Sequence, residues 1–236
     1  MRASAAVSLS FAIILASQAT AQEPAAAQIE FVQKLRVKGY NDLALEYIDK
    51  HKSEPGLAEP LRLERARALA GLARSKEAEQ QAPLFAAARA ELDAFIQKNP
   101  SGPEAAQARL EIARLVAYQG QTLLRRALRD DDVAAARRAE QQFIQASREL
   151  ETAIKVLEGL KGNFTAADKE KTDQIRQRLS QEWVQARFDR ASNYLDQALT
   201  YIDTSNDADN RKRAEAIDQA KQAFKTLAAE IGRAHV

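Results

Sequence analysis

The chain has 236 residues, of which 29% are charged and 6% are aromatic, and its formal net charge is +2. Its 35 lysine and arginine residues nearly balance its 33 aspartate and glutamate residues, which argues against capture of nucleic acid or anionic lipid by charge alone. Cysteine is absent, which excludes disulfides, thiolate catalysis and cysteine-ligated metal sites.

Residues 1–21 have the three regions of a secretory signal peptide. Arg2 supplies the positive charge, an apolar run covers residues 5–16, and small residues at 19–21 form a cleavage site. The apolar run is too short to span a bilayer as a stable helix, and no later stretch is apolar enough to do so. We therefore predict a soluble protein that is secreted across the inner membrane into the periplasm or cell envelope.

Residues 22–100 are predicted to form short helical hairpins in an all-α fold. Good helix formers dominate the chain, and glycine and proline occur in a few clusters. A helix with an apolar stripe is interrupted by Gly39, and Asn41 opens a second helix that ends before Pro55. Two helices joined by a tight glycine turn form an αα-hairpin.

The second helices of these hairpins resemble those of the tetratricopeptide repeat. In that family a small alanine is followed four residues later by a large apolar residue, and a proline closes the helix. Ala88, Leu92, Phe95 and Pro100 match with the family's own spacing. In the preceding hairpin Ala44 and Ile48 match, His51 stands where an apolar residue is usual, and Pro55 comes one position early. The resemblance implies closely packed hairpins that expose a concave groove for a peptide or a partner domain.

Residues 101–230 are predicted to form longer helices, because the alanine anchors of the repeat move further apart along the chain. A capping box at Ser101 and Glu104 opens the first, Asp130–Asp132 cap the second, and Thr165 and Asp168 cap the third. The predicted helices cover residues 103–128, then from the aspartate cap to about 160, then about 165–202, and finally about 214–229.

Two of these helices carry apolar residues spaced alternately four and three apart, which is typical of coiled-coil packing. The two predicted seams are Ala139, Phe143, Ala146, Leu150, Ala153, Leu157 and Leu160, followed by Val184, Phe188, Ala191, Leu195, Ala198 and Ile202. We therefore expect long antiparallel helices that lie side by side and bury both seams.

Large aromatic residues gather on the third long helix. Trp183, Tyr194 and Tyr201 are either core residues or anchors of a partner-binding surface, because tyrosine and tryptophan serve both purposes. Helical spacing alone leaves both interpretations open.

Residues with catalytic or metal-binding chemistry do not form a known motif. His51 has neither a second native histidine nor a cysteine as partner, and it ends a helix. Residues 203–209 are acidic but have Ala208 where a calcium loop needs glycine, so helix capping is the better interpretation. The arginine clusters at 125–138 and 211–213 are flanked by acidic residues. We therefore predict no enzyme, no cofactor and no nucleic-acid partner.

The last six residues, Ile231–Val236, match the translation of a common sequencing adapter. The sequence therefore predicts that residues 231–236 are a non-native tail and that the natural chain continues beyond Glu230. Without the positive charges of Arg2 and Arg233, the formal charge of +2 falls to zero.

Three functions are compatible with these features. The first is a non-catalytic scaffold in the cell envelope that binds a protein or peptide through a helical-repeat surface. The second is a structural helical spacer, and the third is the helical N-terminal region of a larger enzyme. An exposed row of apolar residues would favour the scaffold, whereas complete burial of the apolar residues would favour the spacer.

Overall fold

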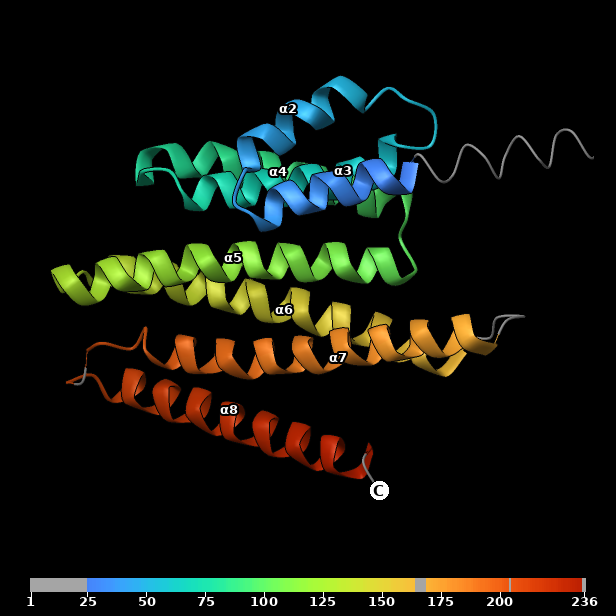
Figure 1. The fold of residues 1–236 in the computed structure, drawn as a ribbon. Coiled ribbons are helices and arrows are strands. Elements are labelled where there is room, and N and C mark those ends of the chain that lie inside the picture. The colour runs from blue at the N-terminus through green and yellow to red at the C-terminus, as the bar shows by residue number, and fades with distance from the viewer. Residues whose placement is uncertain (1–24, 164–168, 204, 235–236) are drawn as a thin grey trace, which may run out of the picture. The chain divides into compact units, whose positions relative to one another are not determined.

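A computed structural model of the chain describes residues 25–163, 169–203 and 205–234, and all regular structure within them is helical (Figure 1). This confirms the predicted all-α class. The chain divides into two compact units between Phe95 and Ile96, inside helix α4 (Ala78–Lys98). The predicted signal peptide at 1–21 and the predicted capping box of Thr165 and Asp168 lie outside the described residues.

The first unit consists of short helices joined by tight turns. Its described helices are residues 25–37, α2 (Asn41–His51), α3 (Ala58–Arg74) and most of α4. Gly39 ends the first helix with a φ of +83°, a left-handed conformation that glycine adopts at little cost. The hairpin predicted around Gly39 is therefore present, and α2 begins at the predicted Asn41.

The core of the first unit is built from the small and large apolar residues that the repeat pattern picked out. Ala44, Ile48, Ala88, Leu92 and Phe95 are all buried. The two prolines of the pattern, Pro55 and Pro100, are exposed in the connections after α2 and α4. A small residue at a buried anchor lets neighbouring helices approach closely, which is the packing that the pattern predicts.

The second unit consists of four long helices, each packed against the next along the chain (Figure 1). They are α5 (Pro103–Asp130), α6 (Val133–Asn163), α7 (Lys169–Ala198) and α8 (Asp207–Ala234). Their number and order agree with the sequence prediction, while several ends differ, among them the end of α8, which is Ala234 rather than about residue 229. Helix α6 continues past residue 160, α7 ends before residue 202, and α8 begins at Asp207 rather than near Ala214.

Helix caps explain some of these ends. The Asp132 carboxylate accepts a hydrogen bond from the Ala135 amide at 2.9 Å, so the predicted aspartate cap of α6 is confirmed. The Asn206 side chain accepts one from the Ala208 amide at 2.9 Å and so starts α8 early. The predicted capping box before α5 is wrong: Gly102 is the N-cap, at a φ of +114°, and no side chain caps the helix.

The seam predicted on α6 forms the centre of the second unit. Its residues from Ala139 to Leu157 are buried, and Leu160 is partly buried. Phe143 is fully buried against α5, where a Cβ atom on Gly120 would lie only 2.9 Å from the phenyl ring. Glycine at this position therefore lets the two helices close around the aromatic side chain.

The seam predicted on α7 is only half right. Ala191 and Ala198 are buried, but Phe188 and Leu195 are exposed on the surface. The helix and the turn that follows it bury instead a line spaced by seven residues: Leu179, Ala186 and Asn193 of α7, and Thr200 after its end. Burial of the polar Asn193 is partly compensated, because its amide nitrogen donates to the Phe143 carbonyl at 2.6 Å and to Ser147 at 2.7 Å, while its side-chain oxygen has no partner among the described residues.

A polar ladder connects α5 to α7 and determines how α7 is rotated. Gln107 donates to Glu182, Arg114 to Asp189 at 3.2 Å, and Gln121 to Asp196 at 2.8 Å. Each residue of the ladder lies seven positions after the previous one on its own helix, so all three pairs face the same way. With these carboxylates directed at α5, the neighbouring Phe188 and Leu195 are left on the surface.

Candidate functional site

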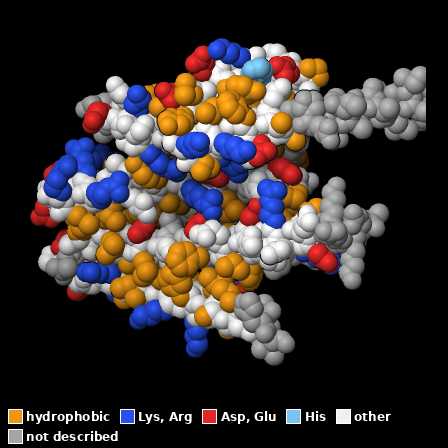
Figure 2. Space-filling model, viewed as in Figure 1, with side chains coloured by type: hydrophobic (Ala, Val, Ile, Leu, Met, Phe, Trp, Pro, Cys, Tyr) orange, Lys and Arg blue, Asp and Glu red, His pale blue; other side chains and the backbone are white. Residues whose placement is uncertain are grey.

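An exposed apolar row runs along α7. Phe188, Leu195 and Leu199 have 49%, 42% and 47% of their surface exposed, and their spacing places them on one stripe of the helix. Phe224 of α8 packs edge-on against Phe188, with ring centroids 5.6 Å apart. We call these four residues the apolar strip. In Figure 2, hydrophobic side chains gather over α7 and α8 in the lower part of the view.

The strip is exposed because α7 has more apolar residues than its neighbours can cover. One face of α7 packs on α6, and the polar ladder faces α5. Ala198 packs with Ala216 of α8, whereas Leu195 and Leu199 are open to solvent. The three exposed side chains lie within about three helical turns, over roughly 16 Å of helix. Such a continuous row differs from the scattered apolar residues of an ordinary surface.

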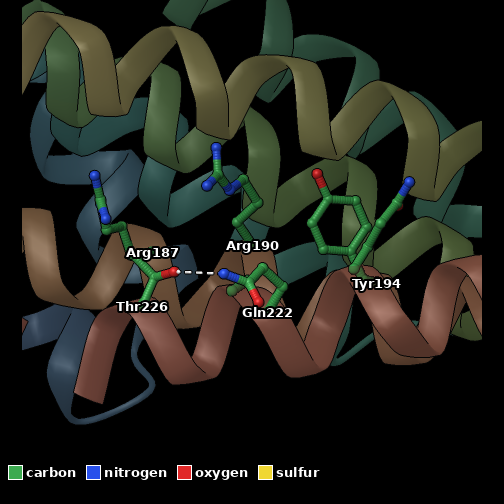
Figure 3. Close-up of a pocket in the computed structure, with 7 residues that line it drawn as sticks. Arg187, Arg190, Tyr194, Gln222 and Thr226 are labelled. Atoms are coloured by element: carbon green, nitrogen blue, oxygen red, sulfur yellow. Dashed lines mark hydrogen bonds between the residues drawn. The ribbon is translucent and has the colours of Figure 1, made fainter. Parts of the chain in front are cut away.

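A cleft of about 250 Å³ lies between α7 and α8. It is lined by Arg187, Arg190 and Tyr194 from α7 and by Gln219, Gln222 and Thr226 from α8, with Ala223 between them. Figure 3 shows Gln222 and Thr226 next to each other on α8, where Gln222 donates to Thr226 at 3.5 Å. Six of the seven residues that line the cleft have polar side chains, and the cleft shares no residue with the apolar strip.

Arg187 is a fixed wall of this cleft. Its two terminal nitrogens donate to Glu230 at 2.6 Å and to Glu158 at 2.8 Å. Its guanidinium also lies over the Trp183 ring, 4.3 Å from the centroid. The Trp183 indole in turn donates to Glu158 at 3.1 Å. Two ion pairs and a stacking contact hold the Arg187 side chain in one orientation.

The three aromatic residues predicted as a partner surface or core have different environments. Trp183 is half-buried and packs on the α6 core, and Tyr194 is half-buried at the edge of the cleft. Tyr201 is only 4% exposed, and its hydroxyl donates to Glu140 at 2.9 Å. The structure therefore places Tyr201 in the core rather than on a surface that a partner could contact.

Tyr201 belongs to a buried polar network at one end of the second unit. The carboxylates of Glu140 and Asp209 are buried, and Arg137 binds Asp209 through one nitrogen at 2.6 and 2.7 Å. Burial and the neighbouring Glu140 carboxylate raise the pKa of Tyr201 to about 12, although a hydrogen bond from Gln197 opposes this. The network connects α6 to α8 and keeps the phenol neutral.

The other chemically distinctive residues of the sequence have structural partners. His51 ends α2, stacks on Tyr47 with ring centroids 4.2 Å apart, and lies 2.5 Å from a Glu54 oxygen. Asp203 accepts hydrogen bonds from the backbone and the hydroxyl of Ser205, as a turn residue does. Within the described ranges, no group of three His, Cys, Asp or Glu side chains is arranged to hold a metal ion.

The arginine cluster that precedes and follows the α5–α6 turn is matched by nearby acids. Arg129 donates to Asp130 at 2.8 Å, and Arg126 and Arg138 both lie within about 4 Å of Asp132. Hydrogen bonding to Arg129 holds the pKa of Asp130 below its ordinary value.

Within the described ranges, the structure contains no helix with the length and hydrophobicity of a membrane span.

Sequence reasoning missed the cleft. Arg190, Gln222 and Thr226 are ordinary surface residues by type, and nothing in their spacing distinguishes them from the other polar positions of a helix. The register of α8 against α7 brings them together, and that register depends on which alanines pack. The predicted α7 seam contains two residues of the apolar strip, Phe188 and Leu195, but the seam pattern predicts that they are buried.

The chain matches no protein-family model, no curated protein and no solved structure.

Proposed function

We propose that the chain is a non-catalytic interaction scaffold of the cell envelope, and that it binds a protein or peptide partner through the apolar strip on α7 and α8. The observation that supports this most directly is the exposure of Phe188, Leu195 and Leu199 in one continuous row. Covering an apolar side chain stabilises a complex by about 25 cal/mol for each Å² removed from water.

The strip favours a scaffold over a structural spacer. A spacer needs only to bury its own apolar residues, and the second unit does so around Phe143 and along the α6 seam. An additional row of large apolar side chains on the surface costs solubility without adding to that core. A partner whose apolar side chains cover the row would remove these side chains from water, and this burial would stabilise the complex.

The tetratricopeptide-like character of the first unit agrees with this proposal. Its buried anchors, including Ala44 and Ala88, have the small size and the burial that close hairpin packing requires. Proteins built of stacked hairpins offer extended surfaces, and binding partners is their general use. Secretion by the predicted signal peptide would place such a scaffold in the periplasm or cell envelope.

Site-specific photo-crosslinking of the full chain tests the proposal. A photoreactive residue in place of Leu195 is expected to form a covalent adduct with an envelope protein, which mass spectrometry identifies. A photoreactive residue in place of Lys155, which is exposed on α6, is the matched control and is expected to form none. The identified partner is then purified and titrated against the wild-type chain.

Loss of apolar contact should weaken that binding. Phe188→Ser and Leu195→Ser are each expected to reduce affinity at least about tenfold if the strip is the centre of the interface. Equal labelling from positions 155 and 195, or unchanged affinity in both variants, would refute the proposal. An adduct with the mass of two copies would instead show that the strip is a dimer interface.

A further inference from the structure

The cleft between α7 and α8 is rich in hydrogen-bond donors and has no carboxylate among its described lining residues. Two guanidinium groups, two primary amides and two hydroxyl groups surround it. Only the amide carbonyls and the hydroxyl oxygens can accept. A cleft with apolar walls, in which the polar groups are mostly donors, fits a ligand that accepts hydrogen bonds.

Arg190 is the unsatisfied group of this cleft. Its guanidinium makes no hydrogen bond or ion pair with any residue that the structure describes, and its Nε is shielded from solvent. The neighbouring Arg187 also has a shielded Nε without an acceptor. A shielded donor without a partner destabilises the folded state, so an acceptor that enters the cleft would remove a penalty already present.

The charges around the cleft determine the kind of anion that fits. The charge of Arg187 is balanced by Glu158 and Glu230. On α6, a hydrogen bond to Lys155 lowers the pKa of Glu151, and burial raises the pKa of Glu158 less than its hydrogen bonds to Arg187 and Trp183 lower it. The charge of Arg190 is the last of the causes that lower either pKa. One cation therefore lacks its own counter-ion, which suits a monoanion better than a phosphate dianion.

We propose that this cleft binds the carboxylate group of an organic monoanion. The planar guanidinium of Arg190 matches the two oxygens of a carboxylate, and Gln222, Thr226 and Tyr194 stand within the same hollow to hydrogen-bond the ligand. A water molecule takes about 30 Å³ of liquid volume, so a hollow of about 250 Å³ has room for several heavy atoms beyond the carboxylate.

The carboxylate has two sources that share this chemistry: a small carboxylic acid in solution, or the acidic side chain of a peptide. Titrations of the full chain followed by ¹H–¹⁵N NMR distinguish them. One arm uses propionate, with chloride and phosphate as comparison anions at equal ionic strength. The other uses a blocked, alanine-rich peptide with a single glutamate and its twin with glutamine.

The expected result is a saturable shift of the amide signals of Gln222 and Thr226. Saturation by propionate at lower concentration than by chloride or phosphate supports a small-molecule ligand. Saturation by the glutamate peptide at concentrations at least about tenfold lower than propionate, with no effect of the glutamine twin, supports a peptide ligand. Shifts that stay linear in both arms, or tighter binding of phosphate, overturn the proposal.

Variants locate the binding within the cleft. Arg190→Gln is expected to weaken carboxylate binding about tenfold or more, because a charge-assisted pair is lost. Arg211→Gln, an exposed change of the same charge on α8, is expected to leave it unchanged. Ala223→Leu fills the hollow without changing any charge and is expected to abolish binding. This second variant keeps the proposal testable if Arg190→Gln does not fold. Equal affinity in wild type, Arg190→Gln and Ala223→Leu overturns the proposal.

This site is independent of the proposed scaffold function, because the cleft and the apolar strip share no residue. Phe188→Ser is expected to bind carboxylate like the wild type. Crosslinking from position 195 without carboxylate binding would contradict only the proposed carboxylate site in the cleft. Carboxylate binding without crosslinking would contradict only the proposed role of the apolar strip.

Discussion

At the scale of single residues, two phenylalanines with equivalent sequence patterns differ in how far they are buried. Phe143 and Phe188 occupy equivalent positions of two seams with the same spacing. Phe143 is fully buried beneath Gly120, whereas Phe188 is half exposed and touches Phe224. The first therefore contributes to the free energy of unfolding, and the second is available to bind a partner.

Truncating the two phenylalanines should show this difference. Phe143→Ala is expected to lower the free energy of unfolding of the second unit by about 3–5 kcal/mol, because it leaves a cavity in the core. Phe188→Ala, the matched control, is expected to cost about 1 kcal/mol or less, since its ring is half in water already. Urea unfolding followed by the fluorescence of Trp183, the single tryptophan, measures both. Equal losses would contradict the burial seen here.

Tyr201 makes stability depend on pH in the alkaline range. Its folded pKa of about 12 lies above the ordinary value of 10, so the neutral phenol is favoured in the folded state. The resulting stabilisation, about 2–3 kcal/mol, is fully present below pH 10 and is lost as pH rises from 10 through 12.

Tyr201→Phe tests this dependence. The variant is expected to be less stable at neutral pH by about 1 kcal/mol, because the hydrogen bond to Glu140 is lost, and to lose less stability between pH 10 and 12 than the wild type. Tyr194→Phe serves as the control because Tyr194 lies at the cleft instead of in this network. Thermal unfolding at several pH values measures the effect, and an unchanged alkaline slope in Tyr201→Phe would contradict it.

At the scale of helices, the aspartates between α5 and α6 have different tasks despite their identical side chains. Asp130 pairs with Arg129, Asp131 ends α5 in the left-handed conformation with a φ of +52°, and Asp132 caps α6. Position relative to the helix ends, rather than charge, decides these roles.

Substitution of adjacent aspartates should therefore have opposite effects. Asp132→Ala is expected to destabilise the second unit by about 1 kcal/mol, because the Ala135 amide loses its acceptor. Asp131→Gly removes the same charge at a left-handed position and is expected to be neutral or slightly stabilising. Midpoints of urea unfolding compare the two. Equal destabilisation by both would mean that charge, not capping, determines the effect.

At the scale of the whole molecule, charge is distributed in local pairs. Near the α5–α6 turn, Arg126, Arg129 and Arg138 have acidic partners within about 4 Å, and Arg137 binds the buried Asp209. The nearly balanced composition and these pairs argue against a broad basic face of the kind that binds phosphate backbones.

The full chain is therefore expected to bind duplex DNA weakly, with a dissociation constant no tighter than the non-specific range of about 10⁻⁴ M at physiological salt. Fluorescence anisotropy of a labelled duplex, titrated at two salt concentrations, measures this. Micromolar affinity with a steep salt dependence would contradict the prediction and point to an unpaired basic surface.

The sequence alone was sufficient for the helical class, the Gly39 turn, the aspartate cap of α6 and the α6 seam, because each depends on neighbours three or four residues apart. Only the tertiary structure decided which face of α7 is buried. Local patterning ranks residues by hydrophobicity, so it favoured Phe188 and Leu195 over Asn193. The polar ladder and the hydrogen bonds of Asn193 reversed that choice, since they join residues 46–75 positions apart. The same rotation of α7 exposed the apolar strip and brought Arg190 to the cleft, because turning a helix to satisfy one face also determines what its other faces present.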